Sequence, residues 1–176
     1  ILALIARLLV TGCLHEDGLA DFLDGFGGGT TRERTLAIMK DSHIGSYGVI
    51  GLICYFLLLL QLHHLPLGLL CILVLSGDCW SKFCASQIVN YLPYARKEED
   101  SKSKTVYNRM SRHELLAGFL CGLLPFVLLL PIKLWIATLF PLLTFFLLYR
   151  LMKRRLQGYT GDCCGATFLL CELSFY

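Results

Sequence analysis

Four nearly uninterrupted apolar stretches constrain the fold of this chain more than any other feature of its sequence. They cover residues 48–60, 65–75, 115–130 and 134–149. A helix that crosses the hydrocarbon core of a bilayer needs about 20 such residues. Each stretch is shorter than that, so we expect flanking residues to complete the helices. None carries the single apolar stripe of a helix on a soluble domain, which favours a surrounding of lipid.

The composition supports this interpretation. Hydrophobic residues make up 56% of the 176 residues, charged residues make up 16%, and the mean hydropathy is +0.63. These values are too apolar for an ordinary soluble domain. Turn signals at residues 61–66 and 131–133 pair the four stretches into two helical hairpins. The sequence therefore predicts an all-α, polytopic integral membrane helical bundle, organised as a single transmembrane domain over residues 1–176 in contact with the lipid bilayer.

Both ends of the sequence are apolar. The chain opens without a methionine and stops in another apolar run. We therefore expect an internal fragment of a longer protein that is truncated at the N-terminus, and a C-terminal truncation is left open. The sequence gives no indication of the oligomeric state.

The basic residues fall into three loops, and this distribution predicts the topology. One loop precedes the first hairpin, one lies between the hairpins and one follows the second, at residues 32–40, 96–112 and 150–155. Because each hairpin crosses the membrane twice, all three loops lie on the same side. By the positive-inside rule that side is cytoplasmic. The net charge of +3 is too small to indicate a nucleic-acid partner.

Three aspartates precede the first basic loop with no span between, so they belong at the same membrane face. Asp17, Asp21 and Asp24 stand at positions i, i+4 and i+7. If this run is helical, their carboxylates share one face. Like charges at that spacing repel each other unless a cation lies among them, and divalent cations prefer oxygen ligands. The three aspartates therefore predict a Mg²⁺ site.

Two further features lie beside the aspartates. His15 is a candidate general base, although a histidine bonded to the backbone is the competing reading. Gly27 and Gly28 belong to a glycine-rich run that directly follows the aspartates. Such a run can bring backbone N–H groups close to an anion, or it can simply end a helix.

Three more polar residues are predicted to reach the same membrane face. Lys40 is a candidate for binding an anion, and Asp41 can orient it, add a metal ligand or cap the next helix. Asp162 lies in a loop after the last basic cluster and is a candidate for phosphate and metal binding. Carboxylates that hold Mg²⁺, together with Lys and Arg, are the groups used in phosphoryl transfer. The sequence therefore predicts an enzyme of that kind.

Several segments together resemble the cobalamin synthase family, also called the adenosylcobinamide-GDP ribazoletransferases. They are HEDGLAD at residues 15–21, DGFGGG at 24–29, IMKDSHIG at 38–45, PYAR at 93–96 and GYTGDCCGAT at 158–167, with EL at 172–173. The resemblance covers nearly the whole chain in order, and the first segment is the most specific. The chain departs from the family at Cys13, where glycine is usual, and at His43 and Lys82, where arginine is expected.

The resemblance implies a transferase of the bacterial plasma (inner) membrane, in the last stage of cobalamin biosynthesis, with its active site facing the cytoplasm. Its substrates are expected to be adenosylcobinamide-GDP and α-ribazole or its 5'-phosphate, with release of GMP. Mg²⁺ held by the three aspartates is expected to bind the diphosphate. His15, Asp41 or an aspartate of the cluster is expected to accept the proton of the attacking hydroxyl.

Two other classes of protein remain as alternatives. A CDP-alcohol phosphotransferase also uses spaced aspartates and Mg²⁺, but its pattern requires arginine where this chain has Asp21. A non-catalytic transporter subunit requires polar residues at several depths of the membrane. Here the acids gather at one face, and only His63 and His64 mark the other.

Overall fold

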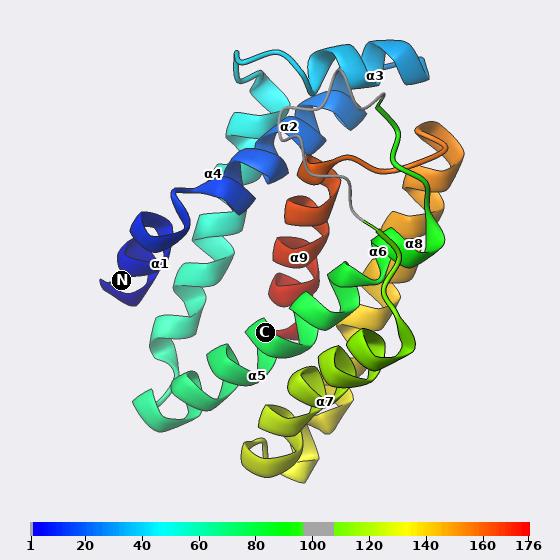
Figure 1. The fold of residues 1–176 in the computed structure, drawn as a ribbon. Helices are drawn as coiled ribbons and strands as arrows, with labels where there is room; N and C mark the ends of the chain where they lie inside the picture. Colours follow the sequence, from blue (N-terminus) through cyan, green and yellow to red (C-terminus); the bar gives the residue numbers. More distant parts are fainter. Residues whose placement is uncertain (1, 97–107) are drawn as a thin grey trace.

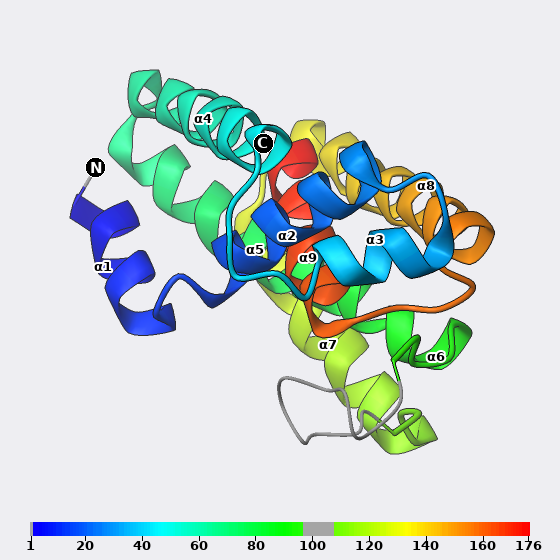
Figure 2. The ribbon, with the colours of Figure 1, turned by 90° about the horizontal axis from the view of Figure 1, so that it is seen from above.

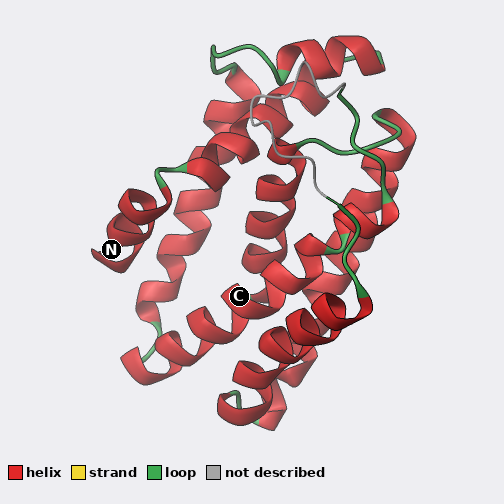
Figure 3. Ribbon diagram, in the orientation of Figure 1, coloured by secondary structure: helices red, strands yellow, loops and turns green. Residues whose placement is uncertain are grey.

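The computed structural model describes residues 2–96 and 108–176. The basic residues predicted between positions 97 and 107 therefore lie outside the described part of the chain. The helices, shown in Figure 1, are α1 (Leu2–Thr11), α2 (Leu14–Gly28), α3 (Arg32–Ile38), α4 (Ser46–Leu60), η1 (Gln61–His64), α5 (Leu67–Ser86), α6 (Ile88–Tyr91), α7 (Arg112–Leu129), η3 (Ile132–Thr138), α8 (Leu139–Arg155) and α9 (Gly161–Phe175). Figure 3 shows that helices and loops make up all of the described residues, which confirms the predicted all-α class.

Both predicted hairpins are present. Four helical segments are long and apolar enough to cross a membrane, namely Ser46–His64, Leu67–Tyr91, Arg112–Leu129 and Ile132–Arg155. The turns that join α4 to α5 and α7 to α8 lie at the bottom of Figure 1, whereas α3 and the end of α8 lie at the top. Many exposed residues of the four membrane-crossing segments are large and apolar, as expected for helices in lipid. The chain is therefore an integral membrane protein.

Helix α9 forms the centre of the bundle. It packs against α2, α5 and α8, and the view in Figure 2 places it among these helices. Cys163, Ala166, Leu169 and Cys171 are completely buried. The sequence predicted only a short apolar run here, so the central position of α9 is a finding of the structure.

A break in the chain separates α1 from α2. Gly12 and Cys13 both have left-handed backbone conformations, with φ of 60° and 57°. Glycine adopts this conformation readily, and other residues adopt it at a cost of about 1 kcal/mol or more. This geometry explains why glycine is expected at the position that Cys13 occupies.

Two arginines tie the polar loops together at the top of the bundle. Arg155 donates to the carbonyl oxygens of Phe26, at 2.7 Å, and of Gly29, near the end of α2. Arg32 donates to the carbonyl oxygens of Leu156 and Ala95, both at 2.8 Å. These bonds bring segments that are far apart in the sequence to one end of the bundle.

Candidate functional site

The acidic run lies within α2 and is therefore helical. Asp17 is exposed and Asp21 is partly buried, whereas Asp24 is only 7% exposed. The two carboxylate oxygens of Asp24 accept hydrogen bonds from the backbone N–H groups of Gly45, at 2.7 Å, and Gly48, at 2.9 Å. Asp24 therefore caps the first turn of α4 from a neighbouring helix.

The described residues contain no group of three or more histidine, cysteine, aspartate or glutamate side chains arranged to hold a metal ion. The joint metal site of the three aspartates therefore stays a prediction. Because Asp24 already binds two backbone N–H groups, a smaller set of ligands fits the geometry better. Mg²⁺ is commonly held by one or two carboxylates together with water and substrate phosphates.

A cavity of about 910 Å³ collects several of the predicted residues. His15 and Asp17 line it from α2, and Asp162 lines it from the first turn of α9. Three basic residues from other segments line it as well, namely Lys82, Arg96 and Arg109. The cavity thus combines carboxylates with cations, which is the combination that the sequence predicts for phosphoryl transfer.

Two glycines allow α2 and α9 to approach closely beside this cavity. A Cβ atom on Gly18 would lie 3.1 Å from the carbonyl oxygen of Asp162, and one on Gly165 would lie 3.3 Å from the backbone of His15. Each contact is tighter than nine in ten Cβ contacts in proteins. The crossing therefore needs small residues, and it places His15 and Asp17 next to Asp162.

This crossing leads to a test of the cavity geometry. Replacing Gly18 with valine is expected to push α9 away from α2, with a loss of about 1–3 kcal/mol in the free energy of unfolding and a loss of catalytic activity. Gly68→Val is the matched control, because a Cβ at Gly68 meets no atom within 4 Å. Unfolding in detergent and turnover would be measured for both variants. Equal stability and activity in the two variants would show that the crossing does not depend on Gly18.

His15 is suited to accept a proton. Its ring packs edge-on against Phe168, with centroids 4.9 Å apart, and its Nδ1 atom is buried with no hydrogen-bond partner among the described residues. Burial lowers the pKa of His15, and the charges of Arg7 and Lys82 lower it further, against an opposing effect of Glu16. These effects favour the neutral imidazole, which is the form that a general base needs.

Three of the other predicted residues line a second cavity. This cavity measures about 240 Å³ and is lined by Asp24, Gly28 and Asp41, among others. Asp41 is exposed and contacts the ring of His43 at 2.7 Å, and hydrogen bonds with His43 lower the pKa of Asp41. Lys40 is exposed at the end of α3. The structure thus places some of the predicted residues at the large cavity and others at the second, and three line neither of these two cavities, namely Asp21, Gly27 and Lys40.

The glycine-rich run ends a helix. Helix α2 continues through Gly28, and Gly29 follows as its cap. A Cβ on Gly27 would lie 2.5 Å from the ring of Tyr47, so this glycine makes room for an aromatic side chain. The C-terminal end of a helix presents carbonyl oxygens and carries partial negative charge. The structure therefore favours the helix-end reading of this run, and anion binding by Gly27 and Gly28 stays a prediction.

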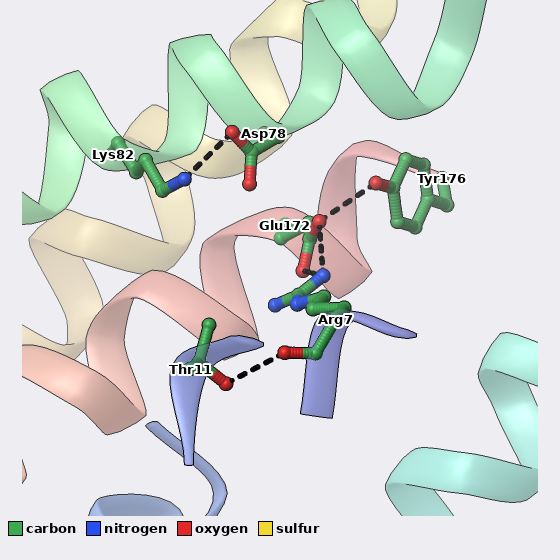
Figure 4. Close-up of polar contacts among 6 residues, drawn as sticks. All are labelled: Arg7, Thr11, Asp78, Lys82, Glu172 and Tyr176. Atoms are coloured by element: carbon green, nitrogen blue, oxygen red, sulfur yellow. Dashed lines mark hydrogen bonds and ion pairs between the residues drawn. The ribbon is translucent and has the colours of Figure 1, made fainter. Parts of the chain in front are cut away.

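A buried polar network, absent from the sequence predictions, lies near the cavity (Figure 4). Arg7 Nη1 donates to both carboxylate oxygens of Glu172 at 2.8 Å, and the hydroxyl of Tyr176 donates to Glu172 Oε1 at 2.8 Å. The side chain of Glu172 is completely buried. Lys82 and Asp78 form a more exposed pair at 2.8 Å. The signal in the sequence was the isolation of Arg7 and Glu172 within apolar runs.

The fold and the cavity define a class: a helical integral membrane protein with a cavity of mixed charge beside a histidine whose neutral form is favoured. Residues 1–176 match the family model described as cobalamin-5-phosphate synthase. The chain belongs to this family. The CDP-alcohol phosphotransferase and transporter alternatives are therefore set aside.

Curated relatives agree with this assignment. Adenosylcobinamide-GDP ribazoletransferases from Shewanella amazonensis and from a Polaromonas species are 42% and 36% identical, and each alignment covers 100% of this chain and 70% of the relative. The Vibrio parahaemolyticus relative of the same name is 38% identical, with 100% of this chain and 67% of the relative covered. No solved structure matches this chain.

Proposed function

We propose that this chain joins adenosylcobinamide-GDP to α-ribazole or its 5'-phosphate, releases GMP, and forms adenosylcobalamin or its 5'-phosphate. Family membership and the names of the curated relatives support the reaction. The single observation that carries the site is the cavity that brings His15, Asp17 and Asp162 together with basic side chains.

In this mechanism the ribazole hydroxyl attacks the phosphate that is attached to the cobinamide arm. A new P–O bond forms, the pyrophosphate P–O bond breaks, and the electron pair leaves with GMP. His15 accepts the hydroxyl proton at a ring nitrogen, because its neutral form is favoured and it lines the same cavity as Asp17. Asp41 lines the second cavity, so it is the weaker candidate for this role.

Mg²⁺ is the proposed cofactor. Asp17 and Asp21 lie one helical turn apart on α2 and would hold the ion together with phosphate oxygens of the substrate. When bound, the ion would supply stabilisation of the charge that develops on the phosphates. Asp24 would not bind the ion in this arrangement. It holds the start of α4 against α2 through its two backbone hydrogen bonds.

We propose that the protein lies in the bacterial inner membrane and that its active site faces the cytoplasm. The described basic residues of the loops before the first hairpin and after the second support this orientation, because positive residues concentrate on the cytoplasmic side of membrane proteins. The opposite turns, at residues 61–66 and 131–133, carry a single lysine, Lys133.

Sealed membrane vesicles test the reaction and the orientation together. The full-length protein would be prepared in inside-out and in right-side-out vesicles. Adenosylcobinamide-GDP and α-ribazole would be added to the external buffer of each preparation, and the GMP released would be measured. We expect GMP from inside-out vesicles only, and from both kinds after permeabilisation. No GMP from permeabilised vesicles would refute the reaction, whereas GMP from intact right-side-out vesicles would refute only the orientation.

A further inference from the structure

We propose that Arg96, together with the N-terminus of α9, forms a binding site for a diphosphate group in the large cavity. The choice of a diphosphate as ligand class rests on the proposed function. The anion site itself rests on the position, burial and unmet hydrogen-bonding capacity of Arg96.

The backbone holds Arg96 at a fixed place opposite the start of α9. The segment before it pairs with the segment before α9 in a short parallel bridge between Tyr94 and Tyr159. The N–H of Ala95 donates to the carbonyl of Tyr159 at 2.8 Å, and the N–H of Tyr159 donates to that of Pro93 at 3.0 Å. Arg32 adds a bond to the carbonyl of Ala95 at 2.8 Å. Arg96 is therefore anchored before any ligand binds.

The segment at Gly158 approaches the segment at Pro93 so closely that only glycine fits there. A Cβ atom on Gly158 would lie 2.6 Å from the carbonyl oxygen of Pro93, which is closer than Cβ contacts in proteins. The two segments can therefore lie side by side only with glycine at this position. This approach sets the distance between Arg96 and the first turn of α9.

The guanidinium of Arg96 is buried, and among the described residues one of its donor atoms has no acceptor. Its side chain is 6% exposed, and its Nη2 atom donates to Asp162 Oδ2 at 3.2 Å. Its Nε atom is buried and has no hydrogen-bond partner in the described structure. A buried donor without an acceptor costs about 1–3 kcal/mol, and an arginine has five N–H donors in a planar fork that matches phosphate oxygens. A phosphate in the cavity would supply the missing acceptor.

The first turn of α9 adds a second attraction for an anion. Gly161 lines the cavity, and a Cβ at this position would meet no atom within 4 Å, so the helix start is open to a ligand. The first N–H groups of a helix lack acceptors within the helix and carry partial positive charge. Thr160 caps this end through the N–H of Cys163.

Lys82 brings a further cation from α5. Its ammonium lies 5.2 Å from the centre of the Phe168 ring, which also lines the cavity. Lys82 pairs with Asp78 at 2.8 Å, and its side chain remains 55% exposed. A diphosphate carries several negative charges, so separate cations on two walls of the cavity suit it better than a single one.

A purely structural role for Arg96 makes a different prediction. If Arg96 only pairs with Asp162 to hold α9, loss of either partner should have the same effect. If Arg96 binds an anion, only the loss of Arg96 should weaken anion binding, because Asp162 places a negative charge beside the bound phosphates. Inorganic pyrophosphate without Mg²⁺ is the probe that separates these roles.

Calorimetric titration of pyrophosphate into the purified full-length protein, in buffer with chelator, tests the site. We expect Arg96→Gln to weaken binding about ten- to a hundredfold, as for loss of charged hydrogen bonds, and Arg96→Lys to weaken it less. Asp162→Asn should bind as tightly as the original protein or more tightly. Arg112→Gln, which removes an exposed cation at the start of α7, should change binding less than twofold.

Three results would overturn the proposal: no binding by the original protein, unchanged binding by Arg96→Gln, or equal weakening by Arg96→Gln and Asp162→Asn. If Arg96→Gln fails to fold, Arg96→Lys carries the test. Binding that depends on Arg96 in a protein that releases no GMP would support the anion site and refute the proposed reaction. GMP release together with pyrophosphate binding that does not depend on Arg96 would support the proposed reaction and refute the anion site.

Discussion

Replacing Asp17 with asparagine is expected to lower GMP release about a hundred- to a thousandfold, comparable to the loss of one group that stabilises transition-state charge. Asp17 lines the large cavity and is exposed, so its charge is available to a cation. Asparagine has nearly the same shape, so the protein should still insert into the membrane and fold. GMP release would be measured in permeabilised membranes at matched protein levels.

Glu33→Gln is the control for this substitution. Glu33 is also an exposed acid in the first turn of a helix, α3, but it does not line the cavity. Removing its charge should change activity less than twofold. If Asp17→Asn keeps more than half of the original activity, Asp17 has no role in the reaction.

The largest expected effect on stability follows from replacing Arg7 with methionine. This change leaves the carboxylate of Glu172, which is completely buried, without its cation. Removing one partner of a buried ion pair costs about 3–5 kcal/mol. The free energy of unfolding of the detergent-solubilised protein, measured by titration with a denaturing detergent, should fall by that amount.

The double variant Arg7→Met with Glu172→Gln identifies the cause. It removes both charges and keeps an acceptor for the hydroxyl of Tyr176, so it should recover most of the lost stability. Lys82→Met breaks the more exposed pair with Asp78 and should cost less than about 1 kcal/mol. If the double variant is no more stable than Arg7→Met, the buried charge of Glu172 is not the source of the loss.

The hairpins were predictable because their signal is local. Length and hydropathy alone mark the helices Ser46–His64 and Ile132–Arg155, and the proline at position 66 marks a turn. Helix α9 could not be recognised as the centre of the bundle in this way. It is shorter than the candidate spans, and tight packing against α2 and α5 favours its small residues. Its buried Glu172 is held by Arg7 from α1.

The site was predictable in part, since spacing placed Asp17, Asp21 and Asp24 on one helix but did not show what each carboxylate faces. Asp24 caps α4 because Gly45 and Gly48 lie against it. These glycines follow Asp24 in the sequence by 21 and 24 positions. The position of Arg96 beside Asp162 depends on the bridge between residues 94 and 159. Such pairings between distant loops have no periodic signal in the sequence.

Binding of Mn²⁺, a spectroscopic substitute for Mg²⁺, tests the central claim most directly, namely that the acidic start of α2 holds a cation against a diphosphate. Free Mn²⁺ would be measured by electron paramagnetic resonance with the purified full-length protein, with and without pyrophosphate. We expect pyrophosphate to tighten Mn²⁺ binding by the original protein, and Asp17→Asn to weaken that binding at least about tenfold. Equal Mn²⁺ binding by the two proteins in the presence of pyrophosphate would contradict the claim.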